Sequence, residues 1–103
     1  MKLYLSGPMD GYPEKNFPAF HAEATRLRAL GYEILSPAEL NAAFPNETYS
    51  WYIARDIFEL EKCDGIVFME GYLRSTGCRI EKLMAEKRNI PQFFSWMLLN
   101  GPV

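Results

Sequence analysis

Two carboxylates, Asp56 and Glu81, occupy positions from which they can converge on one crevice. Asp56 lies in the N-terminal half of a helix predicted over residues 50–63, and this helix runs antiparallel to the predicted strands, so that half lies near their carboxyl edge. Glu81 lies about one turn inside a helix that starts at the same edge. Paired carboxylates in a partly buried pocket have their pKa values pushed apart, which permits acid and nucleophile roles at neutral pH.

Each of these groups also has an ordinary structural interpretation, and spacing alone leaves both interpretations open. Glu81 is compatible with an acid of the first helical turn that is favoured by the helix dipole. Asp56 is compatible with a solvated partner of Arg55 or Lys62. Tyr4, in the middle of the first predicted strand, has the default interpretation of a core aromatic residue whose hydroxyl is satisfied locally.

Two loops at the same edge carry further groups that can bind a ligand. Before the helix that carries Glu81, Ser75 and Gly77 offer a hydroxyl and free backbone N–H groups to a phosphate or a ribose hydroxyl, although an N-cap would use the same atoms. The loop after the first strand matches neither a GxGxxG fingerprint nor a Walker loop. A turn without a ligand is therefore the alternative to a ligand-binding loop. Trp51 and Tyr52 either stack on a base or simply pack. The predicted ligand-binding residues of the two loops are Ser6, Gly7, Pro8, Met9, Asp10, Ser75 and Gly77.

The elements that must position these groups alternate between strands and helices. Short apolar runs bounded by turn residues predict the strands, and apolar residues at helical spacing predict the helices. The predicted strands cover residues 3–5, 32–36, 65–69 and 92–94; the predicted helices cover residues 17–30, 50–63 and a segment between Gly77 and Asn89. Residues 37–48, rich in Pro, Asn and Ala, are predicted to be irregular.

Finer features of the helices follow from the same patterns. Asn16 and Ser50 are the predicted N-caps of the first and second helices. Apolar spacing predicts the inner faces of the second and third helices. These faces comprise Ile53, Ile57 and Leu60 in the second helix, and Ile80, Leu83, Met84 and Lys87 in the third.

This element order predicts an α/β fold in a single domain over residues 1–103, with an apolar tail over residues 95–103. Crossovers of this length require a parallel four-stranded sheet with helices on both faces. The expected strand order is 2-1-3-4, in which the chain winds in opposite directions from the first and third strands. Ligands bind beyond the carboxyl ends of such strands, so we expect a nucleotide-like ligand where loops 6–16 and 70–77 meet.

Composition and charge exclude several classes of protein. With 103 residues, of which 49% are hydrophobic, the chain can form one packed domain. A net charge of −2 and scattered basic residues argue against nucleic-acid binding. No apolar run approaches the ~20 residues of a bilayer span, and no signal peptide is recognised, so a cytoplasmic protein without membrane insertion is expected.

The two cysteines and the single histidine argue against a metal site. Cys63 and Cys78 lack CxxC spacing, and His21 is the single histidine of the sequence. We therefore expect no zinc site and no other metal or cofactor. In a reducing compartment both cysteines are expected to remain thiols.

Three spaced motifs together resemble the nucleoside 2-deoxyribosyltransferase superfamily. They are Leu3-Tyr4-Leu5-Ser6-Gly7-Pro8-Met9, then Arg55-Asp56-Ile57 with Cys63-Asp64, and finally Ser75-Thr76-Gly77-Cys78-Arg79-Ile80-Glu81. The similarity covers residues 1 to about 94. More closely, the chain is similar to a short branch of that superfamily that is common in phages and prophages, which is related to the 2-deoxynucleoside 5-phosphate N-hydrolases.

The resemblance implies a flavodoxin-like, Rossmann-type three-layer fold and cleavage of an N-glycosidic bond in a deoxynucleoside or its monophosphate. It places Glu81 as the nucleophile that attacks the anomeric carbon and Tyr4 as the residue that orients this carboxylate. Asp56 would contribute to acid catalysis at the departing base or to sugar binding. A tyrosine hydroxyl bonded to Glu81 is expected to keep the pKa of this carboxyl low enough for ionisation.

The sequence also departs from the pattern of these relatives. Asp10 stands where phosphate-binding relatives have an arginine, and Arg79 replaces a glycine of the third motif, so Arg74 or Arg79 is the candidate for the missing positive charge. The characterised enzymes complete each active site from a neighbouring subunit, so a homo-oligomer is expected. The departures at Asp10 and Arg79 motivate an alternative function, a non-catalytic module that binds or sequesters a nucleotide.

Overall fold

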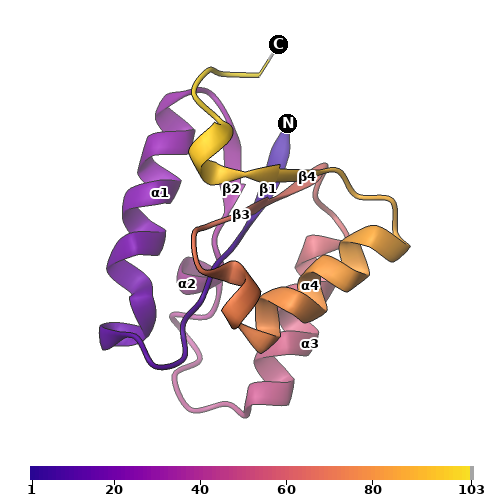
Figure 1. The fold of residues 1–103 in the computed structure, drawn as a ribbon. Coiled ribbons are helices and arrows are strands. Elements are labelled where there is room, and N and C mark those ends of the chain that lie inside the picture. Colours follow the sequence, from indigo (N-terminus) through magenta and orange to yellow (C-terminus); the bar gives the residue numbers. More distant parts are fainter. Residues whose placement is uncertain (103) are drawn as a thin grey trace.

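The computed structural model describes residues 1–102 and shows a four-stranded parallel sheet (Figure 1). The strands are β1 (Lys2–Ser6), β2 (Glu33–Leu35), β3 (Gly65–Phe68) and β4 (Gln92–Phe94). Their order is β2-β1-β3-β4, and every neighbouring pair is parallel. The predicted fold class and strand order are therefore confirmed.

Helices cover both faces of this sheet (Figure 1). Helix α1 (Phe17–Ala29) lies on one face, and α3 (Tyr49–Leu60) and α4 (Thr76–Lys87) lie on the other. A short helix, α2 (Pro37–Leu40), follows β2. Three 3-10 segments complete the chain: η1 (Pro13–Asn16), η2 (Tyr72–Arg74) and η3 (Ser95–Met97).

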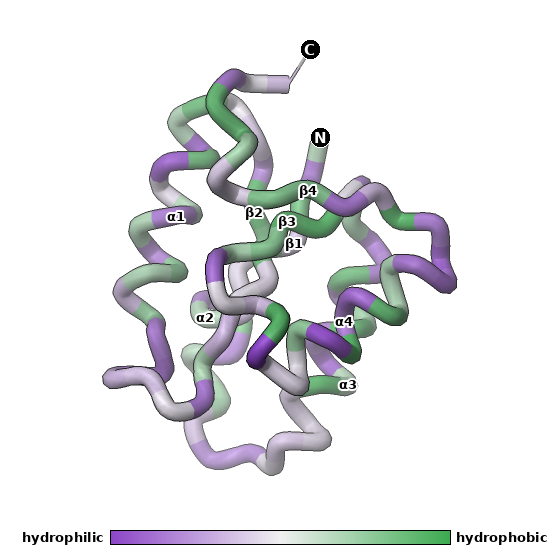
Figure 2. The backbone as a smooth tube through the Cα atoms, viewed as in Figure 1, coloured by the Kyte–Doolittle hydropathy of each residue, from purple (hydrophilic) through white to green (hydrophobic). Residues whose placement is uncertain are grey.

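The strands separate two apolar clusters, and Figure 2 shows the hydrophobic colouring concentrated along the sheet. On the α1 side, Leu3 and Leu5 pack with Phe20 and Leu27 of the helix. On the other side, Tyr4 packs with buried residues of α3, β3 and α4. Successive residues of a strand point to opposite faces, so β1 supplies both clusters. The side chain of Tyr4 consequently lies on the same side of the sheet as α3 and α4.

Asn16 occupies the predicted N-cap position of α1 but makes no side-chain cap bond, and the predicted N-cap of the second helix, Ser50, is wrong. Asn16 has a left-handed backbone (φ 62°), and its side-chain amide donates to the Pro8 carbonyl oxygen at 2.9 Å instead of capping α1. Thr48, not Ser50, caps α3 by accepting from the Trp51 backbone N–H. A hydroxyl two residues before the predicted site thus satisfies one of the free N–H groups at the start of this helix.

The inner face predicted for α4 is wrong in part: Ile80 and Met84 are half-buried, but Leu83 and Lys87 do not face the core. Its buried residues are Cys78, Glu81 and Ala85, whereas Leu83 is 53% exposed and Lys87 is exposed. The apolar pattern failed here because a carboxylate occupies the central position of the buried stripe. In α3, the buried residues are likewise Asp56 and Leu60.

The short helix α2 falls in a segment that was predicted to be irregular. Pro37 occupies its first turn, where a residue without an N–H costs nothing. None of the helices within residues 1–102 is long and apolar enough to cross a membrane.

Candidate active site

The carboxylate of Glu81 is buried and held at both oxygens by hydroxyl groups of β1. The Tyr4 hydroxyl donates to Glu81 Oε2 at 2.5 Å, and the Ser6 hydroxyl donates to Glu81 Oε1 at 2.7 Å. Tyr4 and Ser6 are completely buried, and Glu81 is 5% exposed. Each carboxylate oxygen keeps a further lone pair, so the group is oriented without losing its capacity to react or bind.

Local sequence explains why these three side chains meet. Tyr4 and Ser6 are two residues apart in β1, so both point to the α4 side, while Leu3 and Leu5 point to the opposite core. Glu81 follows Cys78 by three residues and so shares the face of α4 that is turned toward the sheet.

Two glycines allow this close arrangement. A Cβ at position 77 would lie 3.3 Å from both Ile53 and Tyr49 of α3, so Gly77 lets α4 approach that helix. A Cβ at position 7 would lie 2.7 Å from the Met69 sulfur, so a larger residue cannot follow Ser6 without a shift of the neighbouring core.

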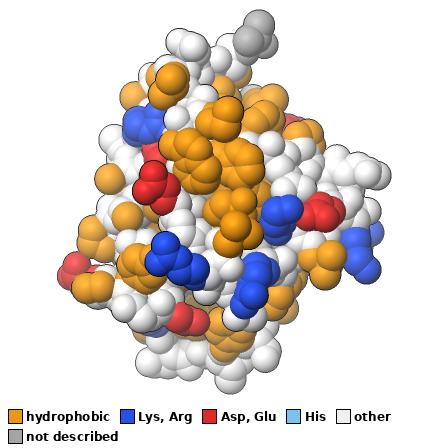
Figure 3. All heavy atoms as spheres, viewed as in Figure 1, with side chains coloured by type: hydrophobic (Ala, Val, Ile, Leu, Met, Phe, Trp, Pro, Cys, Tyr) orange, Lys and Arg blue, Asp and Glu red, His pale blue; other side chains and the backbone are white. Residues whose placement is uncertain are grey.

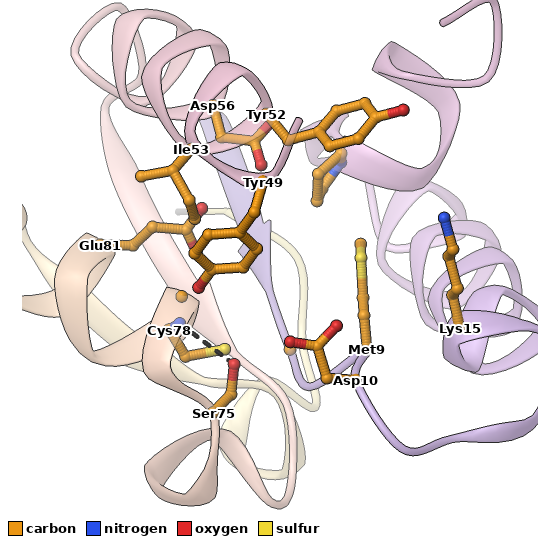
Figure 4. Close-up of a pocket in the computed structure, with 13 residues that line it drawn as sticks. Met9, Asp10, Lys15, Tyr49, Tyr52, Ile53, Asp56, Ser75, Cys78 and Glu81 are labelled. Atoms are coloured by element: carbon orange, nitrogen blue, oxygen red, sulfur yellow. Dashed lines mark hydrogen bonds between the residues drawn. The ribbon is translucent and has the colours of Figure 1, made fainter. Parts of the chain in front are cut away.

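Glu81 and Asp56 line one cavity of about 260 Å³ beyond the carboxyl ends of β1 and β3 (Figure 4). In the close-up, Asp56 and Glu81 approach the cavity from α3 and α4, and Tyr49 lies beside them. Met9, Asp10 and Lys15 occupy the other side. The remaining lining residues are Gly7, Pro37, Tyr52, Ile53, Ser75, Gly77 and Cys78.

A second cavity of about 390 Å³ adjoins the first and shares Met9, Lys15, Pro37, Tyr52 and Asp56 with it. Asp56 therefore lies where the two cavities meet. The walls of the second cavity are mostly apolar, and Glu81 does not line it. Its other lining residues are Glu14, Phe17, Asn41, Ala42 and Pro45.

Burial raises the pKa of both carboxyls. The pKa of Glu81 is raised to about 7 by desolvation, and the hydrogen bonds from Tyr4 and Ser6 offset only part of this effect. The pKa of Asp56 is raised to about 6, again by desolvation, while the hydrogen bond from Asn41 and the nearby hydroxyl of Tyr4 lower it. The expectation that Tyr4 keeps the pKa of Glu81 low is therefore wrong, because the cost of burying the charge exceeds the hydrogen-bond contribution.

Tyr4 itself remains a neutral donor. Its pKa is raised well above the ordinary value by burial and then by the nearby charges of Glu81 and Asp56. A protonated hydroxyl is the form that can donate to a carboxylate.

Both cysteines are free and buried thiols. Burial raises the pKa of Cys78, which lines the first cavity, to about 11. This thiol is therefore protonated near neutral pH and is a poor nucleophile.

Of the predicted ligand-binding residues, Gly7, Met9, Asp10, Ser75 and Gly77 line the first cavity. Ser75 also caps α4 by accepting from the Cys78 backbone N–H at 3.2 Å, so its cap role is realised.

The other predicted residues lie elsewhere. Ser6 lies beneath the cavity and contacts Glu81, and Pro8 is buried with its carbonyl oxygen bonded to Asn16. Arg79 is exposed, contacts Thr76 Oγ1 at 3.4 Å and lies outside the lining of this cavity. Trp51 packs against Phe44, with ring centroids 5.1 Å apart, and also lies outside the lining.

Sequence reasoning missed several lining residues. Tyr49 and Ile53 precede Asp56 by seven and three residues in α3, so helical spacing could have placed all three on one face. Lys15 reaches the cavity only because Glu14, Lys15 and Asn16 all have positive φ (52°, 54° and 62°). Non-glycine residues rarely adopt this conformation, so nothing in the sequence indicated it.

Comparison with known proteins gives a family and a fold. The family model described as a domain of unknown function, DUF4406, matches residues 1–93. No curated protein matches the chain significantly. Among solved structures, the 2-deoxyribosyltransferase of the psychrotolerant bacterium Bacillus psychrosaccharolyticus is similar, with a TM-score of 0.70 and 20% identity over 91% of this chain and 71% of that protein. The similarity to the fold of a deoxyribosyltransferase, which the sequence motifs suggested, is thereby confirmed.

Proposed function

The chain belongs to the DUF4406 family of domains of unknown function, and for this member we propose that it cleaves the N-glycosidic bond of a deoxynucleoside or deoxynucleoside monophosphate. The deoxyribosyl group passes to water or to a second base. One observation carries the proposal: a buried carboxylate, held at both oxygens by Tyr4 and Ser6, lines a cavity together with a second carboxyl, Asp56.

The first chemical step uses both carboxyls. A carboxylate oxygen of Glu81 attacks C1′ of the sugar, and the electron pair of the breaking C1′–N bond goes to the base. Asp56 gives its proton to that nitrogen, so a neutral base leaves and a glycosyl ester of Glu81 remains. Water or another base then attacks the same carbon and displaces the Glu81 carboxylate, while the Asp56 carboxylate takes the proton of the incoming O–H or N–H.

The hydrogen bonds at Glu81 support the nucleophile role. A carboxylate that is fixed by two hydroxyl groups needs no reorganisation before attack. Burial keeps bulk water away from this oxygen and lets neighbouring dipoles act strongly on developing charge.

The raised pKa of Asp56, at about 6, supports the acid role because part of this group is still protonated near neutral pH. The active form of the pair carries one proton in total, on Asp56; because the pKa of Glu81 (about 7) lies above that of Asp56 (about 6), this is the less populated of the two singly protonated forms. Since Glu81 and Asp56 interact electrostatically, activity should follow a narrow bell-shaped pH profile centred between the two pKa values.

A homo-oligomer is the assembly we propose for this enzyme. Figure 3 shows hydrophobic side chains gathered on the face formed by β4 and the segment that follows it. Trp96, Met97 and Leu99 are 45%, 68% and 70% exposed, and Trp96 stacks on Phe94 with centroids 5.0 Å apart. A second copy of the chain would cover this patch. Light scattering after size-exclusion chromatography measures the molar mass in solution, and a monomer at all concentrations would contradict the proposed homo-oligomer.

The function is tested by incubating the purified protein with each deoxynucleoside and deoxynucleoside monophosphate, with and without a second base. Chromatography then detects free base or exchanged nucleoside. Glu81→Gln should abolish product formation, whereas Glu86→Gln, a matched change at an exposed position of the same helix, should not.

The non-catalytic nucleotide-binding alternative gives a different result in the same experiment. A binding module would form no product, would be thermally stabilised by a nucleotide, and would retain this stabilisation in Glu81→Gln.

A further inference from the structure

Asn41, at the C-terminal end of α2, touches one of the two carboxyls and was not singled out by the sequence. Its side-chain Nδ2 donates to Asp56 Oδ1 at 2.8 Å. Asn41 lines the second cavity and not the first, whereas Asp56 lines both. The amide therefore reaches Asp56 from the side of the second cavity.

The position of Asn41 is fixed by its own backbone. Its N–H donates to the Pro37 carbonyl oxygen at 3.0 Å, and its carbonyl oxygen accepts from the Phe44 N–H at 2.9 Å. These bonds tie the residue to both α2 and the following turn. An anchored backbone lets a short side chain hold a neighbour in one orientation.

The amide can face an ionised Asp56 in only one way. The opposite orientation would place Asn41 Oδ1, a pure acceptor, against a carboxylate oxygen. In the observed orientation Oδ1 is buried and has no hydrogen-bond partner among residues 1–102. Leaving a buried acceptor without a hydrogen bond costs free energy. The amide keeps this orientation despite that cost, because the bond from Nδ2 to Asp56 Oδ1 is favourable.

The bond also bears on which oxygen of Asp56 carries the acid proton. Asp56 Oδ1 accepts a hydrogen bond from Asn41 Nδ2, so a proton on Asp56 Oδ1 would lie close to the amide hydrogen and weaken this bond. A proton on Oδ2 is compatible with this bond.

Resting on the proposed function, we infer that Asn41 is a positioning residue that fixes Asp56 Oδ1 and so presents the Oδ2 proton to a leaving base seated in the second cavity. As the C1′–N bond breaks, its electron pair goes to the base nitrogen and this nitrogen takes the Oδ2 proton. Asp56 is left as a carboxylate and Glu81 as its glycosyl ester. The apolar walls of the second cavity, including Phe17 and Tyr52, suit the faces of a planar heterocycle.

Other titratable groups surround the Asp56 carboxyl and act on its protonation as well. Of these, Tyr4 and Arg55 lower its pKa, as Asn41 does. Loss of the Asn41 bond alone should therefore raise the pKa of Asp56 further from its ordinary value. The titratable groups that contact Asp56 or share its cavities come from five segments: Tyr4 of β1, Asp10 of the first loop, Glu14 and Lys15 of η1, Tyr49, Tyr52 and Arg55 of α3, and Cys78 and Glu81 of α4.

The test compares Asn41→Leu, which keeps the approximate size but removes the donor, with Asn46→Leu at an exposed position of the same segment. The pKa of Asp56 is measured by carbon NMR of the carboxyl group and assigned with Asp56→Asn. It should rise in Asn41→Leu and stay unchanged in Asn46→Leu; an unchanged pKa in Asn41→Leu would overturn the inference. This measurement needs no turnover, so it decides the inference even if the wild-type protein cleaves nothing and the proposed function fails.

The second measurement uses two deoxyribosyl substrates whose bases differ in basicity. A weakly basic leaving group needs little protonation, so Asn41→Leu should slow the strongly basic substrate about tenfold more than the weakly basic one. Equal losses for both substrates would show a purely structural role and would contradict the inference. If Asn41→Leu does not fold, Asn41→Ala removes the same donor with less bulk and takes its place in both measurements.

Discussion

The two sides of the first cavity are built in different ways. On the carboxylate wall, Asp56 of α3 and Glu81 of α4 line the cavity, and Tyr4 and Ser6 of β1 support Glu81 from beneath; all four side chains are buried. The loop wall, formed by Met9, Asp10 and Lys15, comes from the segment between β1 and α1, where Asp10 and Lys15 are exposed.

This difference separates two tasks. Bond cleavage needs groups that are held in one geometry, and strands and helices provide such positions. Selection among similar substrates can be performed by exposed loop residues, which vary without disturbing the core. We therefore expect the carboxylate wall to determine rate and the loop wall to determine substrate preference.

Of the substitutions that compare the two walls, Asp56→Asn should have the largest effect on kcat. Loss of a general acid lowers kcat by about 10²–10⁴. It should also remove the alkaline limb of the pH profile, which arises as the Asp56–Glu81 pair loses its last proton. The profile is measured as kcat/KM against pH; an Asp56→Asn profile with both limbs intact would show that another group is the acid.

Asp10→Asn is the counterpart on the loop wall. It should change KM more than kcat and leave both limbs of the profile in place, because Asp10 is exposed. A loss of kcat as large as that of Asp56→Asn would abolish the distinction between the two walls.

The next effect is on stability. Burial raises the pKa of Glu81 from its ordinary value of 4.5 to about 7 in the folded protein, so the contribution of Glu81 to stability is full below pH ~4.5 and is lost as pH rises through ~7. Glu81→Gln removes this loss and should increase the free energy of unfolding by about 3 kcal/mol above pH 8, with little change near pH 4.5. Urea unfolding at both pH values measures the change in the free energy of unfolding, with Glu86→Gln as the exposed control. An equal effect of the two substitutions would mean that burial does not destabilise the ionised form of Glu81.

Tyr4→Phe should have a smaller effect. The substitution removes the 2.5 Å hydrogen bond that stabilises ionised Glu81, so the pKa of Glu81 rises above about 7 and the acid limb of the pH profile moves to higher pH. A shift of one unit lowers the rate on the acid side about tenfold. If the acid limb stays where it is in the wild-type protein, Tyr4 does not control the ionisation of Glu81.

The smallest expected effect is that of Lys15→Met on the loop wall. Lys15 is exposed, so its charge contributes at most about 1 kcal/mol to holding an anionic group. The KM for deoxynucleoside monophosphates should rise a few-fold, with no change for the unphosphorylated nucleosides. Lys87→Met, at the exposed end of α4, is the control, and equal KM values for wild type and Lys15→Met would show that the phosphate is held elsewhere.

The sequence predicted the carboxylate wall better than the loop wall for a physical reason. Alternation in a strand and the spacing of helical residues fix the direction of side chains such as Tyr4 and Glu81. The resulting fold and strand order are those observed. The position of Lys15 depends on three consecutive residues with left-handed backbone conformation. The position of Asn41 depends on a short helix in a segment that was predicted to be irregular. No periodic pattern specifies such features.

The same reasoning explains the error in the pKa of Glu81. A sequence can suggest that Tyr4 bonds to this carboxyl, but the degree of burial depends on how closely α4 packs against β1. Gly77 in addition lets α4 approach α3, because a Cβ there would lie 3.3 Å from Ile53 and Tyr49. Burial then outweighs the hydrogen bonds in setting the pKa.

The most direct test of the central claim is the mass of the intact protein after incubation with 2′-deoxy-2′-fluoroarabinosyl nucleosides. The fluorine disfavours the oxocarbenium-like transition states and slows release of a glycosyl ester, so the ester accumulates. We predict a mass increase of one fluorinated pentosyl group, located by peptide mapping on Glu81 and absent from Glu81→Gln. Release of base without any adduct on Glu81, or an adduct on a different carboxylate, would contradict the account.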